Sequence, residues 1–177
     1  MSVQKLIEYI KNREKYSCLY HFTDKENLAS IDEHGLLSTR ERESKGINPK
    51  NRGGDVKSHR LDREKGLDKY VCLSFTDYLP LYFAATNDGR IPNPTYLKID
   101  PEILHVDNVA FTYGVATAHN AIRMPIAGAI EQIYRDIYGL DEEGNPTRPK
   151  NSLSTEAHKS EILVPKRIEQ KMIIGKV

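Results

Sequence analysis

LYHFT at residues 19–23 and KSEILV at residues 159–164 decide the fold of this chain. Both stretches are rich in apolar and aromatic side chains, and each has the length of a buried β-strand. The first brings His21 to the point where a strand gives way to a helical pattern, and the second opens on an acid, Glu161. The sequence therefore predicts two strands that carry these polar side chains at their ends.

The length and composition are typical of one folded domain. The chain has 177 residues, of which 38% are hydrophobic and 29% charged, so we expect residues 1–177 to form a single domain. No apolar run approaches the roughly 18 residues that a membrane-spanning helix needs, and the first residues lack the apolar segment of a secretory signal. We therefore expect a cytoplasmic protein with no membrane contact, in which Cys18 and Cys72 are buried, reduced thiols.

The overall charge gives no reason to expect a polyanionic partner, because the net charge is only +1 and dedicated nucleic-acid domains are strongly basic. The charge is uneven, however. Nine basic residues lie between Arg40 and Lys65, around the pair Gly53-Gly54. Two interpretations of this segment stay open: a solvated loop, or a surface that binds anions.

Local patterns predict the elements of the first third of the chain. Apolar residues at helical spacing predict an amphipathic helix over the first dozen residues. Thr23 and Glu26 match a capping box, which predicts a helix that starts at Thr23 and ends at Gly35. Residues 39–68 show no period, and a loop of that length inside a domain is usually functional or mobile.

The rest of the pattern mixes strands and helices without regular alternation. Further strands are predicted at residues 17–22, 36–38, 70–75, 95–99, 106–112, 161–164 and 171–174, and further helices at residues 79–85 and 122–138, with Gly139 ending the last. Residues 140–158 are a predicted loop. Because the βαβ rhythm is missing, the predicted class is α+β and not a doubly wound parallel sheet.

Motif searches limit how a ligand can be bound. The sequence has neither a Rossmann glycine turn nor a P-loop, and its histidines show no metal-ligand spacing, so no metal site is predicted. His21 precedes a helix N-terminus, which favours negative ligand groups; the alternative is a histidine satisfied by backbone. Arg52, Arg60 and Arg63 are candidates to grip a diphosphate through a bidentate fork, although Arg63 equally suits an ion pair with an acid on a short helix.

An ordered set of short blocks carries a family resemblance. The blocks are LYHFT at 19–23, Asn27-Leu28 with Ile31, GLLS at 35–38, SHRLDR at 58–63, GLDKYVCLSF at 66–75 and SEILV at 160–164. Together they resemble the DarT family of DNA ADP-ribosyltransferase toxins, in matching order and spacing over most of the chain.

The resemblance implies both a fold and a reaction. The implied fold is a compact ADP-ribosyltransferase fold, in which a split mixed β-sheet with flanking helices clasps NAD as co-substrate. The implied reaction transfers ADP-ribose to a thymine base in single-stranded DNA. The resemblance also implies a toxin that is controlled by an antitoxin with macrodomain-like, ADP-ribosyl-removing activity.

The same resemblance assigns the catalytic groups. Glu161 matches the family's catalytic acid, and the catalytic arginine falls on Arg63, with Arg60 as the alternative. Splitting NAD leaves a positive oxocarbenium at the ribose, which a nearby carboxylate stabilises. The acid would also help to remove the ring N–H proton of thymine. From pattern alone, a surface glutamate at a strand end is the competing interpretation of Glu161.

Other matches concern binding. By resemblance, His21 and Thr23 would contact the nicotinamide end of NAD, Asn27 the adjoining ribose, and Tyr70 would form part of the pocket wall. The loop before Glu161 would then contact DNA phosphates through Arg148, Lys150 and Lys159.

Two segments depart from the usual family pattern, namely residues 76–83 and residues 154–160. The second segment precedes Glu161 and chooses the substrate, so the acceptor is less firmly implied than the use of NAD. An RNA or protein acceptor on the same fold therefore stays open. A third hypothesis is a non-catalytic module that binds NAD or nucleic acid.

Overall fold

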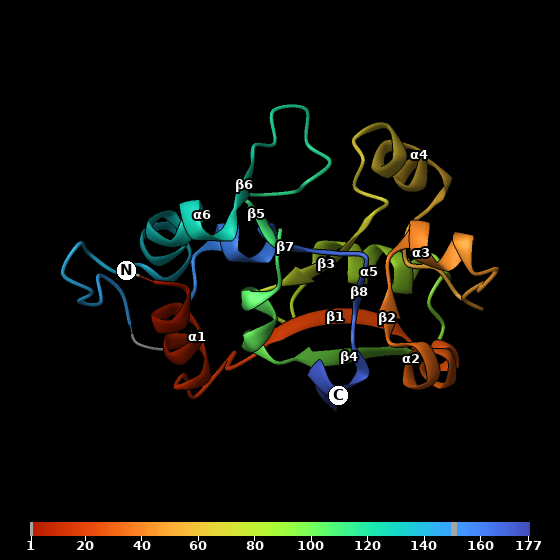
Figure 1. Cartoon of the computed structure of the whole chain (residues 1–177), viewed down its shortest axis with the longest axis horizontal. Helices are drawn as coiled ribbons and strands as arrows, with labels where there is room; N and C mark the ends of the chain where they lie inside the picture. The colour runs from red at the N-terminus through yellow and green to blue at the C-terminus, as the bar shows by residue number, and fades with distance from the viewer. Residues whose placement is uncertain (1, 150–151) are drawn as a thin grey trace.

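The computed structural model describes residues 2–149 and 152–177, and its centre is a seven-stranded sheet (Figure 1). The strands lie in the order β6-β5-β7-β3-β1-β4-β9. Their bounds are Leu19–Asp24 (β1), Tyr70–Ser74 (β3), Pro94–Ile99 (β4), Ala110–Thr112 (β5), Arg123–Pro125 (β6), Glu161–Pro165 (β7) and Ile173–Lys176 (β9). A separate two-stranded sheet pairs β2 (Leu36–Leu37) with β8 (Arg167–Ile168).

The predicted α+β class with a split sheet is confirmed, but the strand directions differ from the prediction. Every strand pair among the described residues is antiparallel, so the sheet is not mixed. Antiparallel neighbours need no helical crossover between them, which explains why the sequence lacks a βαβ rhythm.

The split lies between β1 and β3. Tyr20 and Ser74 form the one registered pair that joins these strands. By contrast, β1 runs beside β4 over its full length, and β3 runs beside β7 over its full length. The sheet therefore opens beyond the Tyr20–Ser74 pair, and His21, the next residue of β1, lies at the opening.

Helices lie at both ends of the sheet. Figure 1 shows α1 and α6 together at one end and α2, α3 and α4 toward the other. The α-helices are α1 (Val3–Lys11), α2 (Leu28–His34), α3 (Thr39–Ser44), α4 (Val56–Glu64), α5 (Pro80–Asn87) and α6 (Ile126–Gln132). Short 3-10 turns cover Lys25–Asn27, Pro101–His105, Thr155–His158 and Gln170–Met172. Within residues 2–149 and 152–177, none of the helices has the length and apolarity needed to cross a bilayer.

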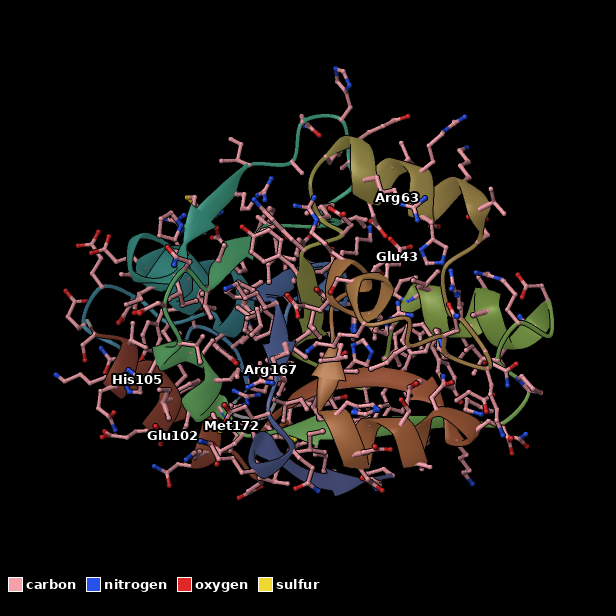
Figure 2. The ribbon with its side chains drawn as sticks, turned by 45° about the vertical axis from the view of Figure 1, so that its right-hand side comes forward. Glu43, Arg63, Glu102, His105, Arg167 and Met172 are labelled. Carbon is pink, nitrogen blue, oxygen red and sulfur yellow. The ribbon has the colours of Figure 1, made fainter. Side chains whose placement is uncertain are left out.

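The prediction of one long loop over residues 39–68 is wrong, because two helices form there. Ser38 caps α3 by accepting the N–H of Glu41, and Asp55 caps α4 by accepting the N–H of Ser58. Neither helix has a buried residue, so no apolar period exists for the sequence to reveal. Figure 2 shows Arg63 of α4 and Glu43 of α3 pointing toward each other, and their ion pair joins the two helices at 2.5 Å.

Two helix starts also differ from the prediction. The helix expected at 122–138 begins at Ile126, because residues 123–125 pair with β5 as strand β6. It continues as a wider π-helical segment over Ile133–Tyr138 and ends, as predicted, at Gly139, which adopts the left-handed conformation. The expected capping box at Thr23 does not form: Asp24 caps the turn by accepting the N–H of Glu26, while Thr23 stays in strand β1.

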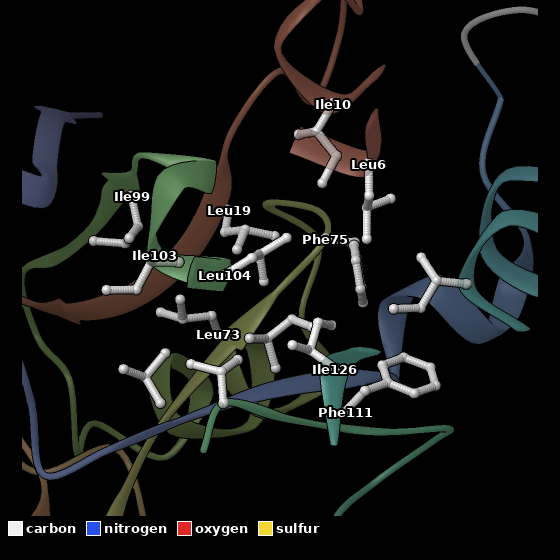
Figure 3. Close-up of a cluster of buried hydrophobic side chains, with 14 of the residues drawn as sticks. Leu6, Ile10, Leu19, Leu73, Phe75, Ile99, Ile103, Leu104, Phe111 and Ile126 are labelled. Carbon is white, nitrogen blue, oxygen red and sulfur yellow. The ribbon is translucent and has the colours of Figure 1, made fainter. Parts of the chain in front are cut away.

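The main core lies between the sheet and the end of the molecule that carries α1 and α6. Figure 3 shows Leu6 and Ile10 of α1 meeting Leu19 of β1, Leu73 of β3 and the ring of Phe75. These five side chains are almost completely inaccessible to solvent. A core of this kind holds β1 and β3 together at the end where they are paired, and leaves the other end of the split free.

Gly35 provides a test of how α2 connects to the small sheet. Its φ of 77° and ψ of 178° lie in a region that essentially only glycine adopts, and a Cβ there would lie 2.5 Å from the carbonyl oxygen of Ile168. We expect Gly35→Ala to lower the free energy of unfolding by about 2–4 kcal/mol, measured by urea denaturation. Gly46→Ala is the control, since Gly46 also has positive φ but open space around it; it should lose about 1 kcal/mol. Equal losses would contradict the close approach of Gly35 to β8.

Candidate active site

A cavity opens where β1 and β3 separate. It has a cavity volume of about 210 Å³ and is partly open to solvent. Its apolar wall contains Ile31, Leu36, Leu37, Ile47 and Ile91, and its polar groups come from His21, Thr23, Asn27, Arg42, Asn51, Arg52, His59 and Tyr70. The four residues predicted to bind NAD, His21, Thr23, Asn27 and Tyr70, are thus brought together in one cavity.

His21 is held in a defined tautomer. Its Nδ1 lies 2.9 Å from the carbonyl oxygen of Cys72, and because a carbonyl only accepts, Nδ1 carries the proton and donates it. Burial lowers the pKa of His21 below its usual value, despite the opposing effect of this hydrogen bond, so the ring is neutral at pH 7. Its Nε2 is then an acceptor, suited to a ligand hydroxyl or amide N–H.

Thr23 and Asn27 are engaged with each other and with a neighbouring loop. The Asn27 amide nitrogen donates to Thr23 Oγ1 at 3.2 Å and to the Asn51 carbonyl at 2.8 Å. Its amide oxygen accepts the N–H of Lys50 at 2.9 Å. The Asn27 side chain therefore fixes the loop that closes one side of the cavity, and this bonding leaves it little capacity for a ligand.

Cationic groups gather at another side of the cavity. Arg42 and Arg52 line it, and so does His59, whose Nε2 is buried without a hydrogen-bond partner among the described residues. Burial lowers the pKa of His59, and the charges of Arg52, Arg42 and Arg63 lower it further. Such an arrangement suits an anionic ligand group, which would accept from the guanidinium groups and satisfy the free ring nitrogen.

The two arginines predicted to be catalytic lie outside this cavity. Arg60 and Arg63 line a shallower adjoining hollow on α4, which Arg52 and His59 share. Arg60 lies 3.6 Å from Glu64, four residues on along the helix, and Arg63 pairs with Glu43 across to α3. Arg63 therefore does form an ion pair, but with Glu43 on another helix and not with an acid three or four residues away on its own helix, as the alternative interpretation had it. Its catalytic role stays a prediction.

Glu161 is the first residue of β7, opposite Ser74 of β3 and Thr112 of β5. Its carboxylate accepts the N–H of Ala116 at 2.7 Å. Burial raises the pKa of Glu161 to about 7, the Ala116 hydrogen bond opposes this shift, and the nearby Asp62 adds to it. A carboxyl group that titrates near neutral pH is what general acid–base chemistry requires.

Glu161 does not line the main cavity, but Cys72 connects the two. Cys72 lies two residues before Ser74 on β3, so its side chain is on the same face of the sheet as Glu161. Burial raises the pKa of the Cys72 thiol, and the charges of Glu161 and Asp62 raise it further. Since Cys72 on β3 lines the cavity and strands are about 4.8 Å apart, Glu161 on the neighbouring β7 lies one strand beyond the cavity wall, and β7 is roughly 10 Å from the strand that carries His21.

Of the residues predicted to contact DNA phosphates, Arg148 is not brought to this site. Arg148 donates to the carbonyl of Ile137 at 3.3 Å, and its guanidinium packs over Gly139 at the end of the α6 segment. Lys150 lies outside the described residues. Lys159 is exposed two residues before Glu161, so it is the only one of the three that the structure positions beside the acid.

Metal-ligating clusters are not found in the part of the chain that the structure describes: no group of three His, Cys, Asp or Glu side chains there is placed to hold an ion. The cysteines in those residues, Cys18 and Cys72, are free thiols, buried and half-buried respectively.

Comparison with known proteins identifies the family. The sequence matches the family model described as "ssDNA thymidine ADP-ribosyltransferase, DarT" over residues 20–175, which is most of the chain. The chain belongs to the DarT family. A search of curated proteins gives no match to this DarT chain.

Solved DarT structures share the fold. Thermosipho africanus DarTG in complex with ADP-ribose matches with a TM-score of 0.66 and 21% identity, over 90% of this chain and 43% of that one. Thermus sp. 2.9 DarT in complex with ADP-ribosylated ssDNA matches with a TM-score of 0.62 and 18% identity, over 88% and 78%. The same Thermus protein in complex with NAD+ gives 0.57 and 17%, over 92% and 81%. The chain thus spans less than half the length of the Thermosipho protein.

Sequence reasoning missed Arg42 and His59 as site residues. Both belong to residues 39–68, where the sequence shows no period and predicts a loop. A signal was present for Arg42, because Ser38 and Glu41 have the spacing of a capping box, and a helix starting there carries Arg42 in its first turns. For His59 the sequence holds no such signal, since only the fold of α4 over the cavity gives it a role.

Arg42 and Arg60 provide a matched pair for NAD binding. Arg42 is half-buried in the cavity, whereas Arg60 is exposed on α4 and outside it. We expect Arg42→Ala to weaken NAD binding by roughly 10- to 150-fold, the worth of a charged hydrogen bond, and Arg60→Ala by less than about threefold. Isothermal titration calorimetry with NAD measures both; a larger loss in Arg60→Ala would move the diphosphate site onto α4.

Glu161 also gives a pH-dependent stability. Because its pKa is raised to about 7 from an ordinary 4.5, its favourable contribution to folding is complete below about pH 4.5 and is lost as the pH rises through 7. We expect Glu161→Gln, which stays neutral, to be more stable than the unmodified protein at pH 8 by on the order of 3 kcal/mol. The difference should shrink toward pH 4. Thermal unfolding across this range measures it, with Glu143→Gln on the exposed loop as the control; a gain that is independent of pH would contradict the burial of the charge.

Proposed function

We propose that this chain transfers ADP-ribose from NAD to a thymine base in single-stranded DNA. The observation that carries the proposal is Glu161, a carboxyl group with a pKa of about 7 on the strand paired with β3; β3 itself forms one wall of a cavity that arginine side chains also line. Membership of the DarT family supports the choice of acceptor. The ssDNA and NAD+ complexes of the Thermus relative agree with it.

NAD would lie along the opening between β1 and β3. Arg42 and Arg52 would hold its diphosphate, since guanidinium forks match phosphate oxygens. The neutral ring of His21 would accept a hydrogen bond from a ribose hydroxyl or the nicotinamide amide through Nε2. Tyr70 would form part of the wall against which the nicotinamide side lies. These contacts would direct the ribose C1 toward Cys72, which is on the same face of the sheet as Glu161.

The chemical step breaks one bond and forms another at the same carbon. The bond between the nicotinamide nitrogen and ribose C1 breaks, its electron pair leaves with nicotinamide, and positive charge develops on the ribose. The ionised Glu161 stabilises this charge. The thymine ring nitrogen then bonds to C1, and its proton passes to the Glu161 carboxylate, whose pKa near 7 lets it accept and later release a proton.

The carboxylate needs its surroundings to act in this way. Ala116 N–H fixes the orientation of one carboxylate oxygen, which leaves the other free for the substrate. Burial keeps water away and strengthens the attraction between the carboxylate and a developing positive charge. Asp62 raises the pKa of Glu161, so it makes the acid a better proton acceptor.

We also propose that the chain is the toxin of a toxin–antitoxin pair. An enzyme that modifies DNA bases is toxic unless it is restrained, so we expect a toxin in the cytoplasm with an antitoxin that removes ADP-ribose, of macrodomain type. The length of Thermosipho DarTG, of which this chain covers 43%, is consistent with a transferase that works beside a further polypeptide region. To test this, the chain would be expressed together with its operon neighbours, and the transferase would be examined for co-purification with an activity that removes ADP-ribose.

A transfer assay tests the activity itself. We expect the unmodified chain, given NAD and a mixed pool of ssDNA, RNA and protein, to add ADP-ribose to thymine-containing ssDNA, as read by mass spectrometry. Glu161→Ala should lower transfer by at least about 10³-fold, because it removes both charge stabilisation and the proton acceptor. Full activity of this variant would overturn the assignment of Glu161.

Controls separate the other hypotheses. Glu161→Gln keeps the shape of the side chain and should be as inactive as Glu161→Ala, while its unfolding curve reports that the fold is intact. An adduct on RNA or protein would keep the enzyme and change its acceptor. Binding of NAD with neither adduct nor nicotinamide release would favour the non-catalytic module. Comparing Arg63→Ala with Arg60→Ala for kcat decides which arginine, if either, is catalytic.

A further inference from the structure

A cluster of exposed rings lies at the start of α5, in a segment that departs from the usual family pattern. Tyr78 and Phe83 leave 53% and 41% of their surface exposed, with their ring centres 4.8 Å apart. The imidazole of His158 lies 5.1 Å from the Tyr78 ring, nearly at right angles to it. We call Tyr78, Phe83 and His158 the ring platform. Large aromatic side chains are seldom left exposed together without a function.

The platform is held rigidly from behind. Phe83 packs edge-on against Tyr82, at 5.3 Å between ring centres, and Tyr82 stacks on Tyr96 of β4 at 4.9 Å. On the other side, the Tyr78 N–H donates to Thr76 Oγ1 at 3.0 Å. These contacts fix the rings before any ligand arrives, which reduces the entropy lost on binding.

Both supports of the platform lead directly to Glu161. Thr76, which lies 3.1 Å from His158 Nδ1, is two residues beyond Ser74, the strand partner of Glu161. His158 itself is three residues before Glu161. Because a chain spans at most about 3.3 Å per residue, Thr76 lies within roughly 7 Å of Ser74 and His158 within roughly 10 Å of Glu161. The platform is therefore held next to the paired strand ends that carry Ser74 and Glu161.

Because the proposed acceptor is a polymer, its nucleotides next to the target contact the protein around Glu161. Thymine in the interior of a strand has a neighbour on each side, so a DNA strand that presents one base to Glu161 must lay its neighbours on the adjoining surface. Single-stranded nucleic acids bind such surfaces by stacking bases on exposed aromatic rings, next to basic groups that follow the phosphates. Lys159 is exposed beside His158, and Asp77 is the one acid next to Tyr78.

We propose that the ring platform stacks a base that flanks the target thymine in single-stranded DNA, and so helps to set the affinity for the acceptor. The inference rests on the proposed function and names the acceptor subsite of that site. Stacking uses the faces of the base and not its edges, so the platform tolerates different neighbouring bases. It also gives Tyr78 and Phe83 a role beyond packing: their outer faces are the binding surface.

Steady-state kinetics with the full chain test this. At saturating NAD, with one oligonucleotide that contains a single thymine, we expect Tyr78→Ala and Phe83→Ala each to raise the KM for DNA by roughly 5- to 50-fold. The kcat should change by less than about twofold. Tyr78→Phe keeps the ring and should restore the KM. Leu81→Ala is the control, because Leu81 is also exposed on α5 but carries no ring.

An oligonucleotide that lacks one base next to the thymine tests whether the ring platform contacts that base. Removing the base on the platform side of the thymine should raise the KM of the unmodified protein to that of Tyr78→Ala. Removing the base on the other side should leave the difference in KM between the two proteins unchanged. An unchanged KM for DNA in both alanine variants would overturn the proposal. Alanine variants that bind a protein partner more weakly but keep the KM for DNA would also overturn it. Absence of any transfer by the unmodified chain would instead overturn the proposed function, while NAD titration would still report a folded cavity.

Discussion

Strands β1 and β3 share one residue pair, Tyr20 and Ser74, and then separate. The separation leaves backbone groups without a neighbouring strand, and a buried carbonyl without a partner costs about 1–3 kcal/mol. His21 removes that cost for Cys72 by donating through Nδ1. The same hydrogen bond fixes the tautomer of His21 and directs its acceptor nitrogen into the opening. The cavity, its histidine and the orientation of β3 are thus consequences of one interrupted strand pair.

Charge is distributed along the site in a way that matches the proposed chemistry. Arg42 and Arg52 supply positive charge at one part of the cavity, where a diphosphate would lie, and His59 supplies a ring nitrogen without a hydrogen-bond partner among the described residues. Glu161 supplies negative charge on the strand beyond β3, and the nearby Asp62 raises the pKa of its carboxyl group. A substrate that is anionic in its middle and becomes cationic at its ribose would find both charges complemented. The ring platform extends this surface toward a polymeric acceptor that carries bases in succession.

The elements that the sequence predicted correctly are those with a strong local signal. Apolar residues at helical spacing gave α1, and the Gly139 stop gave the end of the α6 segment, because both depend on neighbouring residues alone. The elements that it missed are held by polar contacts at a distance. Helices α3 and α4 bury nothing and are joined by the Arg63–Glu43 ion pair, so the hydrophobic pattern carries no trace of them. Thr23 matched a capping box by spacing, yet the strand pairing of β1 with β4 decided its conformation.

The sequence by itself determined the α+β class, the strand that ends in His21, the strand that opens at Glu161, and the family to which these blocks belong. Each follows from the identity and spacing of residues that are close in the chain. The tertiary structure alone decided that the strands are all antiparallel, that Asn27 fixes a loop, that Arg42 and not Arg60 reaches the cavity, and that Tyr78 and Phe83 are left exposed near Glu161. These features depend on how distant segments pack, and packing is set by the summed contacts of the whole chain, which no local pattern contains.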